Sequence, residues 1–231
     1  MRVTAHGDQL IQLTRLPLVF PVNCYLVVEA DGFTLIDTAI GGSGLDILAA
    51  AKRGGRPIVR IALTHAHGDH VGSLDQLHQL LPAAEVLISG RDARLLAGDR
   101  SLDADEPQSK IRGQFLNLAT RPTRTLFPGD RVGSLEVIAS PGHTPGHVAF
   151  LDTRDRTLIA GDAFQTRGGI AVAGVVRPLF PFPAMGTWDR PTSVASARAL
   201  RDLAPTRLAV GHGAVLVDPL AAMGRAIAAA K

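Results

Sequence analysis

The sequence predicts a mixed α/β protein in which two β-sheets pack face to face and helices cover their outer sides. Short apolar, strand-like runs alternate with stretches of helical periodicity, and each half of the chain has several strands followed by a helix. Apolar residues make up 46% of the 231 positions, which is enough for a sizeable core. We therefore expect a single domain that spans residues 1–231.

The first half begins with strands and continues as strand–helix repeats. Its predicted strands span residues 9–16, 25–29, 33–36, 59–63 and 86–88. Its predicted helices span about 45–53, 71–81 and 92–97. Asp31-Gly32 suits a hairpin turn, Ser43 is a candidate N-cap, and Pro82 is expected to end the second helix.

A polar, weakly periodic segment over residues 98–122 separates the halves, and we expect a lid, a helical insertion or a plain surface excursion there. The second half is predicted to have strands at 123–127, 135–139, 148–151, 157–159 and 208–210. Its predicted helices are 192–203 and a final one opened by Asp218 as N-cap and Pro219.

Four potential metal ligands lie within six residues directly after the predicted strand 59–63, namely His65, His67, Asp69 and His70. In extended backbone, side chains 65, 67 and 69 point the same way, whereas His70 lies where the chain turns into a helix. Such a cluster rarely arises from packing alone, so it indicates a metal or catalytic site. Three ligands in line and one offset suit two metal centres better than one.

Three more candidate ligands follow apolar strands, and each comes directly after a glycine: His143, Asp162 and His212. Glycine permits tight turns and close approach of the backbone, which helps a loop residue to reach a buried ion. Together with the first cluster they would complete a two-metal site.

The order and spacing of these motifs resemble the metallo-β-lactamase-fold superfamily of hydrolases. The matching segments are Leu35-Ile36-Asp37-Thr38, the His-x-His-x-Asp-His signature at 65–70, Pro141 to His147, Gly161-Asp162 and Gly211-His212. The resemblance implies a four-layer αββα sandwich with the metals at one edge between the sheets. It further implies that Asp37 orients a ligand histidine, while His147 is structural and His6 and His78 match nothing.

The resemblance also assigns each ligand to a metal. The first metal would be held by His65, His67 and His143, and the second by Asp69, His70 and His212. Asp162 would bridge them with one carboxylate oxygen to each. This nitrogen and oxygen set, with no cysteine, suits zinc, with iron or manganese as alternatives.

The expected activity is hydrolysis of a lactone, thioester or ester by metal-bound hydroxide. Asp69 is the expected catalytic carboxylate, which holds the proton of the hydroxide and delivers it to the leaving group. A persulfide dioxygenase that uses one iron and a non-catalytic metal-binding module are the alternatives.

Aromatic residues in two loops suggest an apolar substrate pocket. The candidates are Phe20, Phe164, Phe182 and Trp188. Asp162 speaks against β-lactamase activity, because true β-lactamases generally lack the bridging Asp. Lactonases are closest in length and ligand set, although their pocket tyrosine is replaced by Phe164 and Gln165.

Composition limits the other classes of function. The net charge is +3, but the arginines are scattered, so we expect a small-molecule substrate and no nucleic acid, and a homodimer is compatible with the sequence. The sequence has no run of eighteen apolar residues, so no membrane span is predicted. The N-terminus lacks signal-peptide features, so we expect a cytoplasmic protein. The single cysteine, Cys24, is expected to be a buried, inert thiol.

Overall fold

The computed structural model describes residues 1–230, which cluster in two compact units. Unit 1 comprises Met1–Gly98 and Phe115–Leu126, and unit 2 comprises Asp99–Gln114 and the chain from Phe127 onward.

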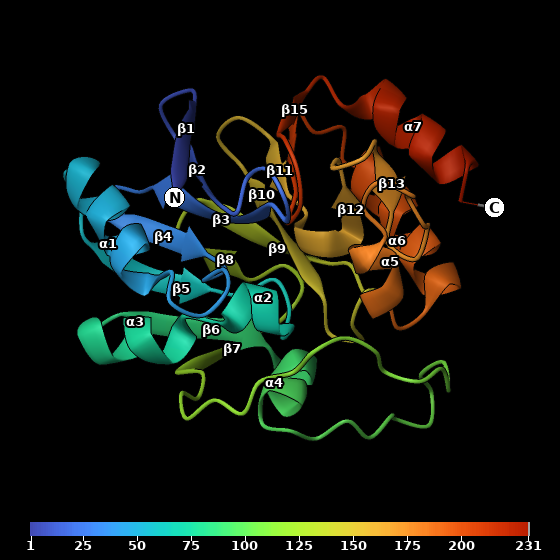
Figure 1. Cartoon of the computed structure of the whole chain (residues 1–231), viewed down its shortest axis with the longest axis horizontal. Helices are drawn as coiled ribbons and strands as arrows, with labels where there is room; N and C mark the ends of the chain where they lie inside the picture. Colours follow the sequence, from blue (N-terminus) through green and yellow to red (C-terminus); the bar gives the residue numbers. More distant parts are fainter. Residues whose placement is uncertain (231) are drawn as a thin grey trace. The chain divides into compact units, whose positions relative to one another are not determined.

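Unit 1 is a sheet with the strand order β1-β2-β3-β4-β5-β6-β7 in the described residues. The strands are β1 (Arg2–His6), β2 (Leu10–Arg15), β3 (Val22–Val28), β4 (Phe33–Ile36), β5 (Ile58–Ala62), β6 (Glu85–Ser89) and β7 (Arg124–Leu126). The helices are α1 (Gly44–Arg53), α2 (Gly68–Val71), α3 (Leu74–Leu80) and α4 (Gly90–Leu96), and α1 and α3 lie against each other (Figure 1).

The topology of unit 1 changes from antiparallel to parallel at β4. Strands β1 to β4 pair antiparallel in sequence order, as the predicted hairpin across Asp31-Gly32 requires. Strands β4 and β5 are parallel, with Ile36 opposite Ala62. The residues that follow both strands therefore leave the sheet at the same edge, which brings Asp37 beside Thr64.

Unit 2 has a main sheet with the order β15-β14-β11-β10-β9-β8, and β12 pairs with β13 in a small sheet. The strands are β8 (Arg131–Val132), β9 (Leu135–Ala139), β10 (Val148–Asp152), β11 (Thr157–Ile159), β12 (Phe164–Gln165), β13 (Ala171–Val172), β14 (Arg207–Ala209) and β15 (Leu216–Val217). Gly161–Ala163 forms a 3₁₀ turn, and the helices are α5 (Phe182–Gly186), α6 (Arg190–Asp202) and α7 (Leu220–Ala228).

In unit 2, as in unit 1, two parallel strands bring the residues that follow them to the same edge of the sheet. Strands β11 and β14 are parallel, with Ile159 opposite Ala209, so Asp162 and His212 both follow the carboxyl ends of neighbouring strands. Helices α6 and α7 pack on each other and on β13 (Figure 1), and buried Ala197, Leu200 and Met223 join the core there.

One helix start agrees with the sequence prediction and one differs. Ser43 is the N-cap residue of α1, as predicted, although within residues 1–230 its side chain makes no capping hydrogen bond and its N–H donates to Ser73 Oγ (2.8 Å). Asp218 adopts a left-handed φ of 48°, so Pro219 rather than Asp218 is the N-cap of α7.

The predicted helix 71–81 is interrupted. It starts early, as α2 at Gly68, and breaks at Gly72-Ser73 before α3. A Cβ on Gly72 would meet Gly41 N at 2.4 Å, so only glycine permits this close packing. Several short elements were not predicted at all, namely β1, β8, β12, β13, β15 and α5.

Within the described chain, residues 98–122 contain no helix or strand, so the predicted helical insertion is absent. The stretch 99–114 belongs to unit 2 and the stretch 115–122 to unit 1. In unit 1, Asp75 of α3 accepts hydrogen bonds from Ala119 N (3.0 Å) and Thr120 N (2.8 Å). These bonds hold the pKa of Asp75 below its usual range although burial acts to raise it. Whether the segment serves as a lid stays a prediction.

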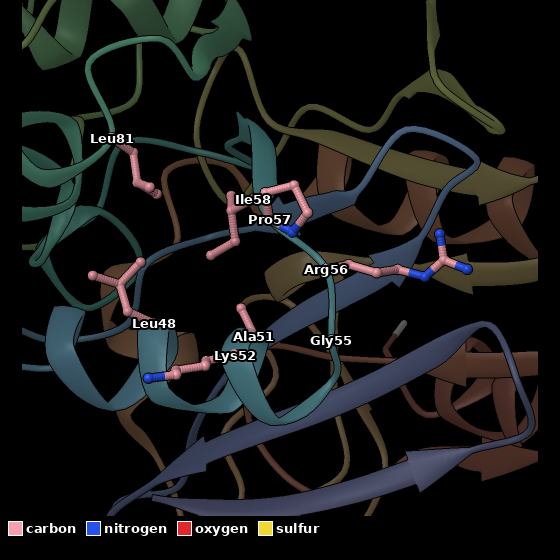
Figure 2. Close-up of a pocket in the computed structure, with 8 residues that line it drawn as sticks. All are labelled: Leu48, Ala51, Lys52, Gly55, Arg56, Pro57, Ile58 and Leu81. Atoms are coloured by element: carbon pink, nitrogen blue, oxygen red, sulfur yellow. The ribbon is translucent and has the colours of Figure 1, made fainter.

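A pocket of about 440 Å³ lies in unit 1 between the end of α1, the start of β5 and Leu81 (Figure 2). Apolar side chains such as Leu48, Ala51 and Ile58 line it, with Lys52 and Arg56 at its border. The predicted metal ligands and substrate residues are not part of its lining. In residues 1–230, no helix is both long and apolar enough to cross a membrane.

Candidate metal centre

The candidate ligands of unit 1 follow β5, with His65 and His67 in the turn before α2 and Asp69 and His70 in α2 itself. His65 and His70 are fully buried, His67 is nearly so and Asp69 is partly exposed. A ring nitrogen of His65 lies within 4.8 Å of a ring nitrogen of His67 and also of one of His70. A carboxylate oxygen of Asp69 lies within the same 4.8 Å of a ring nitrogen of His70. Buried, adjacent imidazoles of this kind are costly unless something binds them.

Asp37 organises two of these imidazoles. Its Oδ2 accepts hydrogen bonds from His70 Nδ1 (2.7 Å) and from Thr64 Oγ1 (2.8 Å), and its Oδ1 accepts from Thr64 N (2.8 Å). His65 Nδ1 lies 3.0 Å from Thr64 Oγ1. Because the Thr64 hydroxyl gives its only hydrogen to Asp37, it must accept from His65 Nδ1–H. One carboxylate therefore fixes both histidines in the tautomer that leaves Nε2 for a metal.

Asp92 of α4 is a buried partner of the same loop that the sequence did not reveal. Its Oδ2 accepts a hydrogen bond from Ala66 N (2.9 Å), and Ala66 lies between the candidate ligands His65 and His67. Its own N–H is capped by Ser89 Oγ (3.1 Å). The pairing joins positions 26 residues apart, so no local pattern could have indicated it.

The candidate ligands of unit 2 are arranged around Asp162. Its Oδ2 lies 3.2 Å from His212 Nε2 and 3.4 Å from His143 Nε2. Two atoms bound to one tetrahedral zinc ion at about 2.0–2.2 Å are about 3.3–3.6 Å apart, so the separation to His143 lies within this range and the separation to His212 just below it. The resemblance assigned one carboxylate oxygen to each metal, whereas here the same oxygen faces both imidazoles.

His147 has a structural role, as the resemblance implied. Its Nε2 accepts a hydrogen bond from Asp162 N (3.1 Å), and Nδ1 lies 2.8 Å from Ser140 Oγ. Nε2 must carry the lone pair, so the proton is on Nδ1 and is donated to Ser140. Both ring nitrogens are engaged, and His147 holds the backbone of Asp162 in place.

The predicted substrate residues lie in different environments. Phe164 is fully buried in the core of unit 2, Phe20 is partly exposed, and Phe182 of α5 is half exposed with its ring 5.3 Å from that of Phe180. Trp188 is buried, and its indole N–H donates to Ser109 O (2.9 Å). A substrate contact for these four residues stays a prediction.

Cys24 is buried, as predicted from the sequence. Burial raises the pKa of the Cys24 thiol, and the nearby Asp37 carboxylate raises it further. The thiol therefore stays protonated at neutral pH.

The comparisons with known proteins agree on one family. Residues 17–212 match the family model described as the metallo-beta-lactamase superfamily. An uncharacterized protein, YobT of Bacillus subtilis (strain 168), is 53% identical over 100% of this chain and 99% of its own length. A hydroxyacylglutathione hydrolase of Xanthomonas oryzae pv. oryzae (strain MAFF 311018) is 30% identical over 68% of this chain, which spans only 52% of that relative.

A solved structure supports the same assignment. The crystal structure of TTHA1623 in a di-iron-bound form has a TM-score of 0.67 and 30% sequence identity, and the match covers 90% of this chain and 95% of that one. This likeness and the family model confirm the predicted fold class. The chain belongs to the metallo-β-lactamase superfamily and is a metal-dependent hydrolase.

Proposed function

We propose that the ligands of unit 1 and unit 2 together bind two divalent metal ions, and that the enzyme hydrolyses an ester-like bond in a small molecule. The ligands are His65, His67, Asp69 and His70 from unit 1, and His143, Asp162 and His212 from unit 2. The bond is that of a lactone, a thioester or an ester.

One observation carries this proposal. Asp37 directs the Nδ1–H of His70, and Thr64 that of His65, so that Nε2 of each ring keeps its lone pair. Metal-binding histidines almost always donate their other ring N–H in this way, because it sets the tautomer and raises the basicity of the ligand. In unit 2, the distances from Asp162 Oδ2 to Nε2 of His143 and of His212 are a second observation that supports the proposal.

Two bound divalent ions would polarise a carbonyl group and lower the pKa of water to roughly 7, which makes a nucleophile available at neutral pH. Asp69, at the start of α2, is partly exposed and is the proposed proton carrier. It accepts the proton of the attacking water and passes it to the leaving alkoxide or thiolate.

Zinc is the proposed metal, because histidine nitrogens and carboxylate oxygens form the ligand set. Iron stays within the proposal, since the structural relative TTHA1623 was crystallised in a di-iron form. Zinc and iron can both bind this set of nitrogen and oxygen atoms, so the hydrolysis assay is run with each metal separately.

The substrate is proposed to carry an apolar group beside the scissile bond. In unit 2, the exposed apolar side chains Leu179, Phe182 and Met185 gather on or next to α5. In unit 1, Leu18 and Val19 are each 81% exposed in the loop after β2. The hydroxyacylglutathione hydrolase among the relatives supports a thioester as the first substrate to test.

The test combines metal analysis with a hydrolysis screen. Apoprotein is loaded with zinc or with iron, and turnover is measured on lactones, thioesters and aryl esters, with Asp162→Asn as the control for background hydrolysis. Two metals per chain, and turnover that Asp162→Asn loses, would support the proposal. Two metals with no turnover on any ester-like substrate would contradict it, and one iron with oxygen consumption would indicate a persulfide dioxygenase instead.

A further inference from the structure

Thr187 lies directly after α5 and contacts the imidazole of His143. Its Oγ1 is 3.1 Å from His143 Nδ1 and donates a hydrogen bond to Pro183 O (2.8 Å). A threonine hydroxyl has one hydrogen, and here that hydrogen is given to the Pro183 carbonyl. Thr187 Oγ1 must therefore accept from His143 Nδ1–H, which leaves the lone pair on Nε2, the atom that faces Asp162.

The backbone keeps this contact in register. Trp188 N donates to His143 O (3.0 Å) and Asp189 N donates to Gly142 O (2.9 Å), so residues 187–189 are bound alongside the loop that carries the ligand. Gly142 has a φ of 134°, and a Cβ there would meet Ser193 N at 2.4 Å. The loop is thus packed directly on the first turn of α6, which leaves His143 little freedom to move away from Thr187.

Asp189 anchors the same stretch from the other side. Its Oδ2 accepts from Thr192 N (3.0 Å) and Thr192 Oγ1 (2.6 Å) as the N-cap of α6, and its Oδ1 accepts from Ser109 Oγ (3.1 Å). Although burial acts to raise the pKa of Asp189, these hydrogen bonds keep it below its usual range. The carboxylate therefore stays charged at neutral pH and fixes residues 187–189 to a helix.

We propose that Thr187 is a positioning residue of the metal centre, which acts through His143 by holding its ring in the tautomer with Nδ1 protonated and Nε2 available. This inference rests on the proposed role of His143 as a metal ligand. The side-chain hydroxyl of Thr187 performs for His143 the task that Asp37 and Thr64 perform for the histidines of unit 1. Like Thr64 beside His65, and unlike Asp37 beside His70, Thr187 is neutral, so an ion bound by His143 would gain no negative charge from this partner.

The test needs Thr187→Val, which keeps the shape and removes the hydroxyl, and Thr187→Ser, which keeps the hydroxyl. Thr157→Val is the matched control, because Thr157 is a buried threonine of β11 in the same unit whose hydrogen bonds are to Asp155 and Arg207 rather than to a proposed ligand. Long-range ¹H–¹⁵N spectra of the metal-free proteins at about pH 8, where an ordinary imidazole is neutral, report the tautomer of His143. The His143 signal is assigned by its loss in His143→Gln, and zinc affinity is measured by competition with a chelator.

The expected result is Nδ1 protonation of His143 in the wild type, with Thr187→Val shifting the proton to Nε2. Thr187→Val should bind one of the two zinc ions about 10- to 100-fold more weakly, while Thr187→Ser and Thr157→Val stay close to the wild type. Nε2 protonation in the metal-free wild type would overturn the inference, even if Thr187→Val fails to fold. Unchanged zinc affinity in a folded Thr187→Val would also overturn it.

The two proposals fail in different ways. A wild-type protein that binds no zinc contradicts the proposed function, whereas the spectrum of the metal-free protein still tests the Thr187 contact. Two tightly bound ions in both the wild type and Thr187→Val contradict only the role of Thr187.

Discussion

Asp37→Asn is the substitution that probes the unit 1 ligands most sharply. Asp37 has a left-handed φ of 60°, a conformation that asparagine also tolerates, so the backbone should not be strained. Asn Oδ1 can still accept from Thr64 N, but the amide NH₂ then takes the place of Oδ2. It presents a donor to His70 Nδ1 and to Thr64 Oγ1, both of which donate to Asp37 in the wild type.

The magnitude follows from the two tautomers. His70 must move its proton to Nε2 to accept from the amide, and the Thr64 hydroxyl is freed to donate to His65 Nδ1, which moves that proton also. Loss of such a partner typically weakens metal binding 10- to 100-fold, so each ion should bind about 10- to 100-fold more weakly. The overall constant for binding both ions should then fall by about 10²- to 10⁴-fold, or about 2.7–5.4 kcal/mol. The metal-free protein should lose about 1–3 kcal/mol of unfolding free energy from the lost hydrogen bonds.

The assay is chelator competition for zinc, with urea denaturation of the metal-free protein alongside it. Asp31→Asn is the matched control, because Asp31 is an exposed aspartate in the adjacent β3–β4 turn that pairs with Arg60 (2.6 Å) rather than with a histidine. The control should bind zinc as the wild type does. If Asp37→Asn also binds both ions with wild-type affinity, the tautomer argument is wrong.

Three further predictions concern other parts of the protein. Asp69→Asn should keep the fold, and kcat measured at full metal loading should fall by about 10²- to 10⁴-fold; near-normal turnover at full metal content would refute a catalytic role. Gly142→Ala should lower the free energy of unfolding by about 1–3 kcal/mol in urea denaturation and weaken zinc binding, because its Cβ would meet the backbone of Ser193. Gly129 has a φ of 88° and open space around it, so the control Gly129→Ala should change stability but not zinc binding. Because the raised pKa of Cys24 keeps its proton in the folded state, unfolding free energy should fall by about 1.4 kcal/mol per pH unit above about pH 8.5. Urea denaturation of metal-free Cys24→Ala should lack this part of the slope, and equal slopes would contradict the reasoning.

Much of the arrangement was predictable because the chemistry lies where strands end. The cluster 65–70 follows a strand that the apolar pattern indicated, and Asp162 and His212 follow two others. Parallel pairing of β4 with β5 and of β11 with β14 then gathers these ends at sheet edges. A local pattern of strand, turn and polar residue is therefore sufficient to find the candidate ligands.

The residues that hold the ligands in place were mostly not predictable. Asp37 was identified only through the resemblance, and Asp92 and Thr187 were missed because their partners are 26 and 44 residues away in the sequence. Threonine and aspartate in loops have many ordinary roles in turns and caps, so composition does not distinguish a residue that orients an imidazole.

The predicted boundaries of the helix at 71–81 were wrong for a different reason. The periodicity of residues 71–81 is helical throughout, but Gly72 packs on the Gly41 backbone and Ser73 Oγ donates to Ile40 O (2.7 Å). These tertiary contacts break the helix between α2 and α3 and outweigh the local preference.

The most direct test is a crystal structure of the zinc-loaded protein with anomalous scattering measured at the zinc edge. The proposal predicts two peaks, one about 2.0–2.2 Å from Nε2 of His65 and His143 and the other at that distance from Nε2 of His70 and His212, both in contact with Asp162. A map with no peak beside Asp162, or with His143 and His212 turned away from the bound zinc, would contradict it.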